Sequence, residues 1–444
     1  MSDLFIIGAS GTRAYRQAMA AISENIANAS TEGYSRRSLT TVESGSSTAT
    51  MATYISRANF GGTEVKGVNR ASDPYLDAAV RYTGTALSSS TARLRWMSDI
   101  EGALNDTDTG IGKLMTGMFQ NIDKLAASPG DRSLRVTTLD SISRVAEAFQ
   151  RTSADLAQIS SGIATEAQAS TDTINRSLSQ LADINNSLLR SQPGTSAYAQ
   201  LLDSRDAALN TLSANLNVDI SFGAHDQAQI IYGGQTLVQG NAATTLALTV
   251  NANGTLDLAT TGGTALTAPS NGTLGGLFSA ATTTTQRRTS LDTLAQQFVT
   301  DMNAWHAQGR TDANVAGGAL LSGTTAATVT ALITDPAAVA TKSTDGTLNG
   351  NLLTAGTVLR GNGSVEQGWT SIIATQANLL SSVKAEQSTA QSRSDQAIGA
   401  REAVSGVDLD MEAAELLRLQ QAYSGSAKIL QVAKETVDAI LQII

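Results

Sequence analysis

The amino-acid sequence predicts a mainly α-helical protein with one small β domain and a helix at each end of the chain. Three observations predict this class. Apolar residues recur at three- and four-residue steps over most of the chain, as on one face of a helix. Between residues 217 and 278 the spacing changes to alternation, as in a strand. From Ser405 to Ile444 the apolar residues repeat every seven positions. We therefore expect a long helical bundle formed by the N- and C-terminal halves, with terminal coiled-coil helices.

The N-terminal segment, residues 4 to 29, has the pattern of an amphipathic helix. Its apolar stripe is thin, because Leu4, Ile7 and Ile22 are joined there mainly by glycine and alanine. A cluster of turn-forming residues from 28 to 34 stops the helix.

The middle of the chain is predicted to be mostly helical. Residues 36 to 84 alternate weakly and contain several glycines, so extended strands and loops are expected there. Beyond them, helices are expected on either side of breaks at Pro129-Gly130 and Pro193-Gly194. The helical spacing covers residues 87–104, 111–125, 139–188 and 198–216.

A small β domain is predicted at residues 217 to 278. Val218, Ile220 and Phe222 alternate with polar residues, and Asn253-Gly254 between two apolar runs is a strong hairpin signal.

Helical spacing returns after the β domain, from residue 291 to 305. Residues 309 to 365 are rich in Gly, Thr and Ala, and are expected to be loop with a few strands. A last long helical region begins at Trp369 and is interrupted at Ser405-Gly406.

The C-terminal segment has the most regular pattern in the chain, and Asp408 is placed to cap its start. Residues at steps of seven form the predicted seam: Leu409, Leu416, Tyr423, Leu430, Val437 and Ile444. Ordering each residue costs about 1 kcal/mol, whereas each buried aliphatic side chain returns about 2 kcal/mol. The seam therefore needs a partner along its length. We expect both ends to become ordered on packing against neighbouring subunits, although an ordinary intramolecular bundle is the alternative.

Composition limits the classes of function. Charged residues make up 16% of the chain and aromatic residues 4%, so packing depends on small aliphatic contacts. The net charge of −9 argues against nucleic acid or an anionic membrane as the main partner. With no cysteine, the chain has no disulfide and no thiolate metal site. No cleavable signal peptide is expected, because the N-terminus lacks a charged n-region followed by an apolar h-region. No membrane span is expected, because no apolar run approaches about 18 residues.

The motifs of catalysis are missing from the sequence. His225 and His306 belong to different predicted domains and are expected at the surface or at a helix end. There is no phosphate-binding glycine loop, no nucleophile elbow and no His-Glu-x-x-His pair. An adhesin or a glycan-active enzyme is the alternative class, but the acids of the β domain, Asp219, Asp226 and Asp257, are scattered between turns. We therefore expect no enzyme activity, no cofactor and no metal.

Two end motifs resemble those of the flagellar rod, hook and hook-associated proteins. Residues 25 to 36 read N-I-A-N-A-S-T-E-G-Y-S-R, which is similar to the turn that ends the N-terminal helix of that family. Residues 405 to 423 read S-G-V-D-L-D-M-E-A-A-E-L-L-R-L-Q-Q-A-Y, which is similar to its closing helix. The flagellin-like helical middle, with residues 201–206 and 291–305, resembles the hook-associated members. Residues 309–365 depart from the larger relatives, because they are too short for the outer domain inserted there.

The resemblance implies a structural subunit that joins hook to filament as a ring of copies. The alternative is another axial protein: a hook, rod or filament subunit. The partners implied are copies of the chain, hook protein, a second hook-associated protein and an export chaperone at the C-terminal helix, with no nucleic acid and no membrane. The location implied is the extracellular flagellum, reached by type III export without a cleavable signal peptide.

The resemblance also implies a domain organisation and an assembly interface. The terminal helices, 1–40 and 405–444, would form an inner tube, residues 41–216 and 279–404 a helical bundle, and residues 217–278 the β domain. The implied assembly interface consists of Leu4, Ile7, Ile22, Asn25, Asn28, Thr31, Gly33, Tyr34, Leu409, Leu416, Tyr423, Leu430, Val437 and Ile444.

Overall fold

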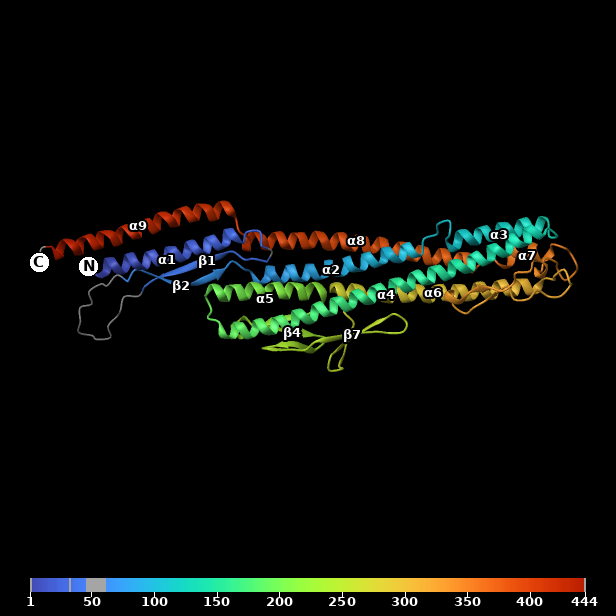
Figure 1. Ribbon diagram of the computed structural model, residues 1–444, viewed down its shortest axis with the longest axis horizontal. Coiled ribbons are helices and arrows are strands. Elements are labelled where there is room, and N and C mark those ends of the chain that lie inside the picture. The colour runs from blue at the N-terminus through green and yellow to red at the C-terminus, as the bar shows by residue number, and fades with distance from the viewer. Residues whose placement is uncertain (1, 32, 45–60, 443–444) are drawn as a thin grey trace.

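The structure, a computed structural model, describes residues 2–31, 33–44 and 61–442. These residues form a long rod of roughly aligned helices, and the first and last helices lie together at one end of it (Figure 1). The mainly helical class with small sheets is confirmed.

The end of the rod that holds both chain ends is built from four elements, which we call the terminal module. Helices α1 (Ser2–Ala27) and α9 (Leu409–Leu441) lie side by side, next to strands β1 (Arg37–Glu43) and β2 (Thr63–Arg70). The two strands pair antiparallel, with Arg37 opposite Arg70. Asp408 caps α9 as predicted, because its side chain accepts hydrogen bonds from the backbone N–H groups of Asp410 and Met411.

Six long helices form the rest of the rod: α2 (Pro74–Ala103), α3 (Ile111–Ala127), α4 (Arg132–Arg190), α5 (Ser196–Asn215), α6 (Gly272–Gln308) and α8 (Val365–Ser405). Helix α4 has 59 residues and spans most of the rod, and Asp131 caps its start. The core between these helices contains Trp305, Trp369 and a stacked aromatic pair, Phe149 and Phe298, whose ring centroids lie 5.6 Å apart.

Residues 74 to 84 are helical, so the prediction of extended structure up to residue 84 is wrong there. Asp73 caps α2 and Pro74 occupies its first turn. Asp followed by Pro is a helix-start signal, and the weak alternation of the preceding residues had obscured it.

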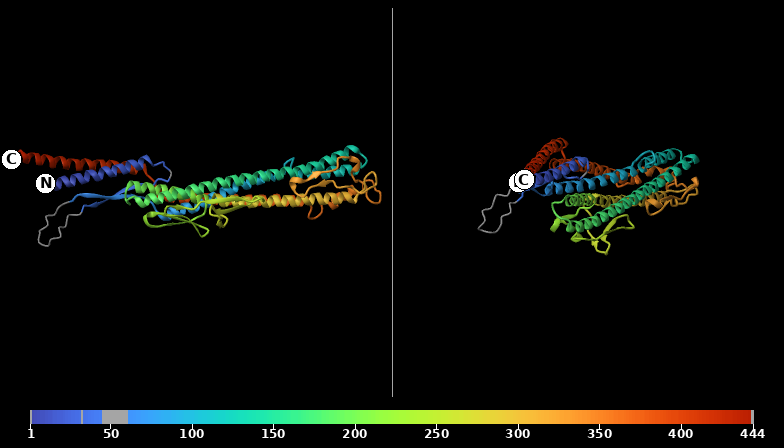
Figure 2. Two further views of the ribbon diagram at one scale, coloured as in Figure 1. Left: turned by 60° about the horizontal axis from the view of Figure 1, so that its bottom comes forward. Right: turned by 60° about the vertical axis from the view of Figure 1, so that its left-hand side comes forward.

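The β domain lies along one side of the rod, against α4 (Figure 2). Strands β3 (Asp219–Phe222), β4 (Ala228–Tyr232), β5 (Gln235–Gln239) and β6 (Ala242–Ala243) form one sheet. Strands β7 (Leu246–Val250), β8 (Leu256–Thr260) and β9 (Ala265–Leu266) form another. The hairpin predicted at Asn253-Gly254 is confirmed: Val250 pairs with Leu256, and Gly254 has a φ of +92°.

The strands end at Leu266 and helix α6 begins at Gly272. The prediction that the β domain extends to residue 278 is therefore wrong for residues 272–278, which are helical. Close packing explains the early helix, since a Cβ on Gly276 would lie 2.3 Å from the carbonyl oxygen of Ser89 in α2. Gly276 therefore lets α6 approach α2 at this point.

The far tip of the rod contains the predicted loops with short strands β10 (Leu321–Ser322) and β11 (Thr330–Ala331). Three short turns of 3-10 helix occur at 224–226, 326–328 and 336–338. Helix α7 (Gly350–Val358) was not predicted, because nine residues with two glycines give little helical signal. Among the described residues, no helix is long and apolar enough to cross a membrane.

Candidate functional site

Helices α1 and α9 pack closely because α1 presents small residues to α9. A Cβ added to Gly8 would lie 2.8 Å from Leu430 Cγ, and one added to Gly11 would lie 2.7 Å from Ser426 Oγ. Glycine thus permits a helix contact that a larger side chain would push apart. The thin stripe predicted for the N-terminal helix is the surface on which α9 lies.

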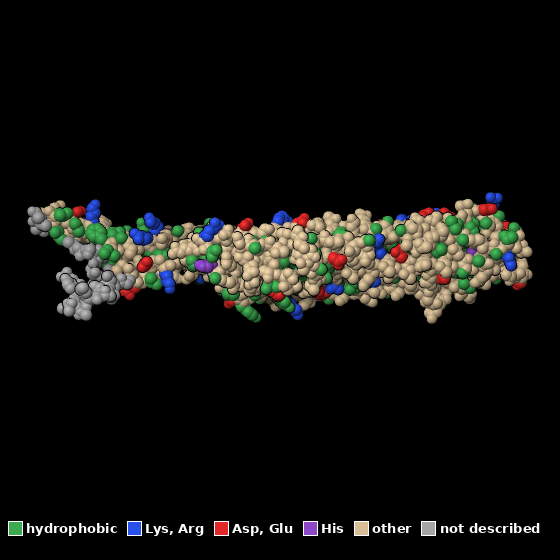
Figure 3. Space-filling view, turned by 90° about the horizontal axis from the view of Figure 1, so that it is seen from below, with side chains coloured by type: hydrophobic (Ala, Val, Ile, Leu, Met, Phe, Trp, Pro, Cys, Tyr) green, Lys and Arg blue, Asp and Glu red, His purple; other side chains and the backbone are tan. Residues whose placement is uncertain are grey.

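This pairing leaves much of the apolar surface of both helices uncovered. Large apolar side chains that are at least a third exposed are Leu4, Phe5, Ile6 and Ile26 on α1, and Leu409, Met411, Leu417, Tyr423, Ile429, Val432, Ile440 and Leu441 on α9. Hydrophobic side chains gather at this end of the molecule in Figure 3. We call the twelve exposed apolar residues of α1 and α9 named above the open apolar face. Exposed apolar clusters are typical of protein–protein interfaces, membrane interaction sites and ligand-binding grooves.

The residues of the predicted seam do not all lie on the same side of α9. Leu430 faces α1, and Leu416 and Val437 are half-buried. Leu409 and Tyr423 are exposed, and Ile444 lies outside the described residues. The positions most buried against the neighbouring elements are Glu412, Leu419 and Ala433.

On α1, the predicted residues also differ in exposure. Ile22 is buried, Ile7 is half-buried and Leu4 is 43% exposed. Apolar residues lie in two series on two sides of α9, and the apolar stripe of α1 is too narrow to cover both sides. One series therefore faces α1 and the other faces solvent.

The amide of Asn25 joins the helix, the strand and the C-terminal helix. Its Nδ2 donates to the carbonyl oxygen of Arg37 at 2.9 Å and to Glu412 Oε2 at 3.0 Å. Its Oδ1 accepts from the N–H of Arg37 at 2.8 Å and from the hydroxyl of Tyr34 at 2.9 Å. Asn25 is fully buried, and all four bonds are made. Burial raises the pKa of Tyr34 to about 12, so this hydroxyl remains a donor at neutral pH.

The turn after α1 is held by local bonds between the predicted residues. Asn28 Nδ2 donates to the carbonyl oxygen of Glu24 at 2.9 Å, and Thr31 Oγ1 donates to Asn28 Oδ1 at 3.3 Å. Gly33 has a φ of +80°, a conformation that favours glycine. The structure therefore brings Asn25, Asn28, Thr31, Gly33 and Tyr34 into one compact turn.

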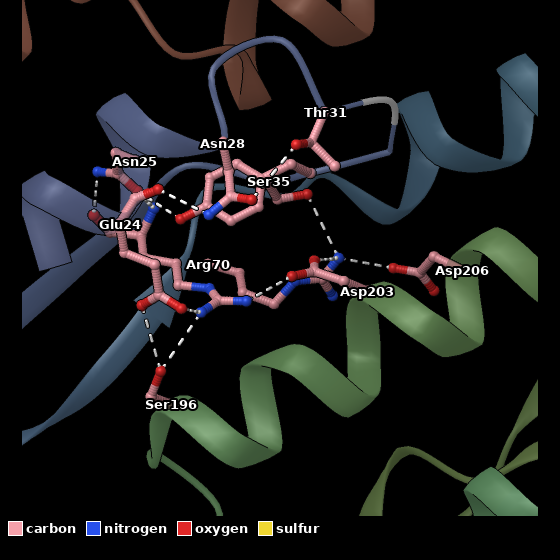
Figure 4. Close-up of polar contacts among 11 residues, drawn as sticks. Glu24, Asn25, Asn28, Thr31, Ser35, Arg70, Ser196, Asp203 and Asp206 are labelled. Atoms are coloured by element: carbon pink, nitrogen blue, oxygen red, sulfur yellow. Dashed lines mark hydrogen bonds and ion pairs between the residues drawn. The ribbon is translucent and has the colours of Figure 1, made fainter.

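A chain of ion pairs links this turn to α5 (Figure 4). Arg37 contacts Glu24 and pairs with Asp203 at 2.8 Å. Arg70, opposite Arg37 in the strand pair, lies 2.8 Å from both Asp203 and Asp206. Burial alone would lower the pKa of Arg37, but hydrogen bonds to Asp203 and Glu24 outweigh it and raise that pKa. The terminal module is thus attached to the bundle by paired charges.

Sequence reasoning did not predict the roles of Arg37, Arg70, Asp203, Asp206 and Glu412. Arg37 and Arg70 sit in weakly patterned strands, and the partners in α5 are far away in the sequence. The only available signal was the acidic stretch 201–206, noted for its resemblance to the hook-associated proteins.

The histidines lie in different parts of the fold, His225 at the surface and His306 at a helix end, as expected. His225 is exposed in the turn at 224–226. His306, expected at the surface or at a helix end, lies in the last turn of α6 but is fully buried. Its Nδ1 contacts the carbonyl oxygen of Gly318 at 2.6 Å, and its Nε2 accepts from the N–H of Ala340 at 2.8 Å. Within the described ranges, no group of three or more His, Cys, Asp or Glu residues is placed to hold a metal ion.

Three family models match different parts of the chain. The model of the flagellar hook-associated protein FlgK helical domain matches residues 97–321, about half of the chain. The model of the flagellar basal body rod FlgEFG protein C-terminal region matches residues 402–443. The model of the flagella basal body rod protein matches residues 6–34.

Curated relatives agree with these matches. Flagellar hook-associated protein 1 of Escherichia coli is 28% identical over 56% of this chain and 45% of its own length. The protein of the same name from Salmonella typhimurium is 26% identical over 70% of this chain and 57% of its own. The protein of the same name from Bacillus subtilis is 26% identical over 47% of this chain and 42% of its own length. The chain therefore spans about half the length of the curated relatives it matches.

A solved structure shares the fold. The flagellar hook junction protein FlgK from Burkholderia pseudomallei aligns with a TM-score of 0.51 and 24% identity, over 56% of this chain and 46% of that one.

A helical rod whose paired end helices both match flagellar rod-protein models has the organisation of an axial flagellar protein. The helical-domain match and the curated relatives are more specific. The chain belongs to the family of flagellar hook-associated proteins that contain the FlgK helical domain.

Proposed function

We propose that this chain is a non-enzymatic structural subunit of the bacterial flagellum, which joins the hook to the filament through its terminal module. The observation that carries the proposal is the open apolar face, which α1 and α9 leave uncovered after they pair with each other. Leu417 is 61% exposed and Leu441 is 66% exposed, whereas Leu419 is only 6% exposed. Burying such side chains against neighbours stabilises association by about 25 cal/mol per Å².

In this proposal, copies of the chain pack as a ring, with their terminal modules side by side as a coiled-coil inner tube. A ring requires a heterologous contact, in which one face of a copy meets a different face of the next. The two apolar series of α9 suit this requirement: one faces α1 in the same chain, and the other remains for a neighbour. Residues 1–40 and 405–444 form the assembly region, residues 41–216 and 279–404 the flagellin-like bundle, and residues 217–278 include the β domain.

The partners proposed follow from the same face. Above and below the ring, the terminal module meets hook protein and a second hook-associated protein. Before assembly, an export chaperone covers the exposed side of α9, because an uncovered apolar helix invites aggregation. The chain reaches the extracellular flagellum by type III export without a cleavable signal peptide.

A hook, rod or filament subunit is the second candidate, and the rod-protein models that match both ends of the chain favour it. The two candidates differ in location. A junction subunit gives one labelled spot between hook and filament, whereas a filament or hook subunit labels the whole length of its segment. Rod labelling would lie at the base of the hook.

The assembly role is tested by placing charge on the open apolar face. Leu417→Asp and Val432→Asp change exposed residues of α9, which are 61% and 47% exposed, and leave Leu419 and Ala433 in place. We expect the purified variants to keep their helical content. In cells, we expect loss of the junction label and of motility, because an unpaired carboxylate in an apolar interface costs several kcal/mol.

The matched control is Gln420→Asp, which adds the same charge at an exposed polar position of the same helix. This variant should assemble and swim normally. Normal swimming and a normal junction label in the Leu417→Asp and Val432→Asp strains would reject the role of the open apolar face.

A further inference from the structure

A cleft of about 520 Å³ lies in the bundle, and none of its lining residues belongs to α1 or α9. It forms where α2, the connection from α5 to β3, and β3 itself meet. Arg81 of α2 lines it together with Tyr82, Asp219 and Phe222. Its volume is in the range of ligand-binding clefts.

Arg81 is partly buried, yet its guanidinium has no hydrogen bond or ion pair among the described residues. The nearby carboxylates are already used: Asp77 Oδ1 accepts from Arg401 Nε at 2.7 Å, and Asp206 Oδ1 accepts from Arg205 Nη2 at 2.7 Å. Burial lowers the pKa of Arg81, and the charges of Asp206 and Asp77 offset this only in part. Among the described residues, Arg81 therefore has no carboxylate in direct contact, although the exposed Asp219 lines the same cleft.

Arg81 lies in a cleft without a paired carboxylate among the described residues. A guanidinium that has left water without gaining a carboxylate is destabilising. The chain as a whole is acidic, with 39 Asp and Glu against 30 Lys and Arg. The other charged residue of the cleft lining, Asp219, is exposed, whereas Arg81 is partly buried and unpaired among the described residues, so Arg81 can pair with a carboxylate of an acidic partner.

The rim of the cleft has the composition of a protein interface. Tyr82 is 79% exposed, and Tyr75, seven residues earlier on the same side of α2, is also 79% exposed. Phe222 is 43% exposed, and the guanidinium of Arg205 lies 4.3 Å from its ring centroid. Tyr and Arg are the residues enriched where protein partners bind most tightly.

We propose that this cleft is a docking site for an acidic side chain of a neighbouring copy of this chain, whose carboxylate pairs with Arg81. Tyr82 and Phe222 then cover the apolar flank of that side chain. A second copy fits because the chain is acidic and because, by the proposed function on which this inference rests, copies lie side by side in a ring. The outer side of α4 supplies suitable groups, since Asp155, Asp172 and Asp183 are exposed and have no ion pair within the part of the chain that the structure describes.

The test places a photo-reactive benzoylphenylalanine at position 82 of the full chain, in cells that assemble flagella. Irradiation should give a cross-linked product of two copies of the chain. Combining this with Arg81→Glu should lower the cross-link yield about tenfold, because a charge-assisted pair is replaced by repulsion. Arg81→Lys keeps the charge and should retain most of the yield.

The matched control is Arg132→Glu, which reverses an exposed arginine in the first turn of α4, away from the cleft. Its cross-link yield should equal that of the wild type. Circular dichroism of each variant checks that the fold is kept. If Arg81→Glu unfolds, Arg81→Gln removes the charge with less disturbance and tests the same pairing.

The outcomes separate this inference from the proposed function. If the label on the chain is absent from the hook–filament junction, the proposed function fails, and the inference fails with it. If the label is at the junction, the inference alone is overturned by any of three results: no cross-link, a cross-link only to a different protein, or a yield unchanged by loss of the Arg81 charge.

Discussion

At the scale of single residues, the terminal module depends on buried polar groups, among which Asn25 makes all four of its hydrogen bonds. Asn25 satisfies a strand N–H, a strand C=O, a tyrosine hydroxyl and the carboxylate of Glu412 with one amide. A buried amide with several partners fixes geometry more strictly than an apolar side chain, because each bond has a direction. Asn25 therefore helps to fix how β1 lies against α1, together with the contact between Glu24 and Arg37.

We expect Asn25→Ala to loosen this junction without unfolding the rod. The substitution leaves both backbone groups of Arg37, and the Tyr34 hydroxyl, without their partners, and each unmet buried group costs about 1 to 3 kcal/mol. Hydrogen exchange at the Arg37 amide should accelerate by about tenfold or more, while the interior of α4 stays protected. Asn28→Ala, which removes only local bonds, should have a smaller effect, and equal effects of the two would contradict this account.

His306 makes the far tip of the rod sensitive to acid. Burial lowers the pKa of His306, because the charged imidazole would lie in the core, and its Nε2 must stay unprotonated to accept from Ala340. The unfolded chain takes up this proton below a pH of about 6.5. The free energy of unfolding should therefore fall as the pH drops below that value, by at most about 1.4 kcal/mol per pH unit from this group.

The measurement is urea unfolding of wild type and His306→Gln between pH 7.5 and 5. Both proteins contain other titrating groups, so the difference between their slopes isolates His306. The wild type should lose stability more steeply below pH 6.5 than the variant does. If the free energy of unfolding changes with pH in the same way in both proteins, protonation of His306 is not coupled to folding.

At the scale of elements, the sequence predicted most helices, because their apolar spacing extends over many turns. Helix α4 and the start of α9 at Asp408 were predictable from periodicity and from a local capping residue. Short or closely packed elements were not: α7 has only nine residues, and the first turns of α6 depend on contact with Ser89 in α2. The candidate site was predictable only in part, for the same reason. Its turn residues are local in sequence, whereas the pairing of Arg37 and Arg70 with α5 is set by tertiary packing.

At the scale of the whole molecule, the rod and the terminal module are packed in different ways. The main hydrophobic core extends from Ala92 to Val383 in the chain, and it contains no residue of α1 or α9. Where α1 and α9 lie together, the buried apolar residues are Ala14, Ala21 and Ile22 of α1 and Leu419 and Ala433 of α9. The contacts from the terminal module to the bundle are polar, through Arg37 and Arg70 to α5 and from the N–H of Arg36 to the carbonyl oxygen of Ser405.

This separation predicts that a chain of residues 71–405 folds alone. Each residue of the main hydrophobic core keeps the apolar residues against which it packs. The carboxylates of Asp203 and Asp206, which lose their pairing with Arg37 and Arg70, become hydrated at the new surface. We expect a helix-dominated circular dichroism spectrum and a cooperative melting transition within a few degrees of that of the full chain, since the hydrophobic contribution is unchanged. A broad, non-cooperative transition would contradict the prediction, because it would show that the terminal module completes the core of the rod.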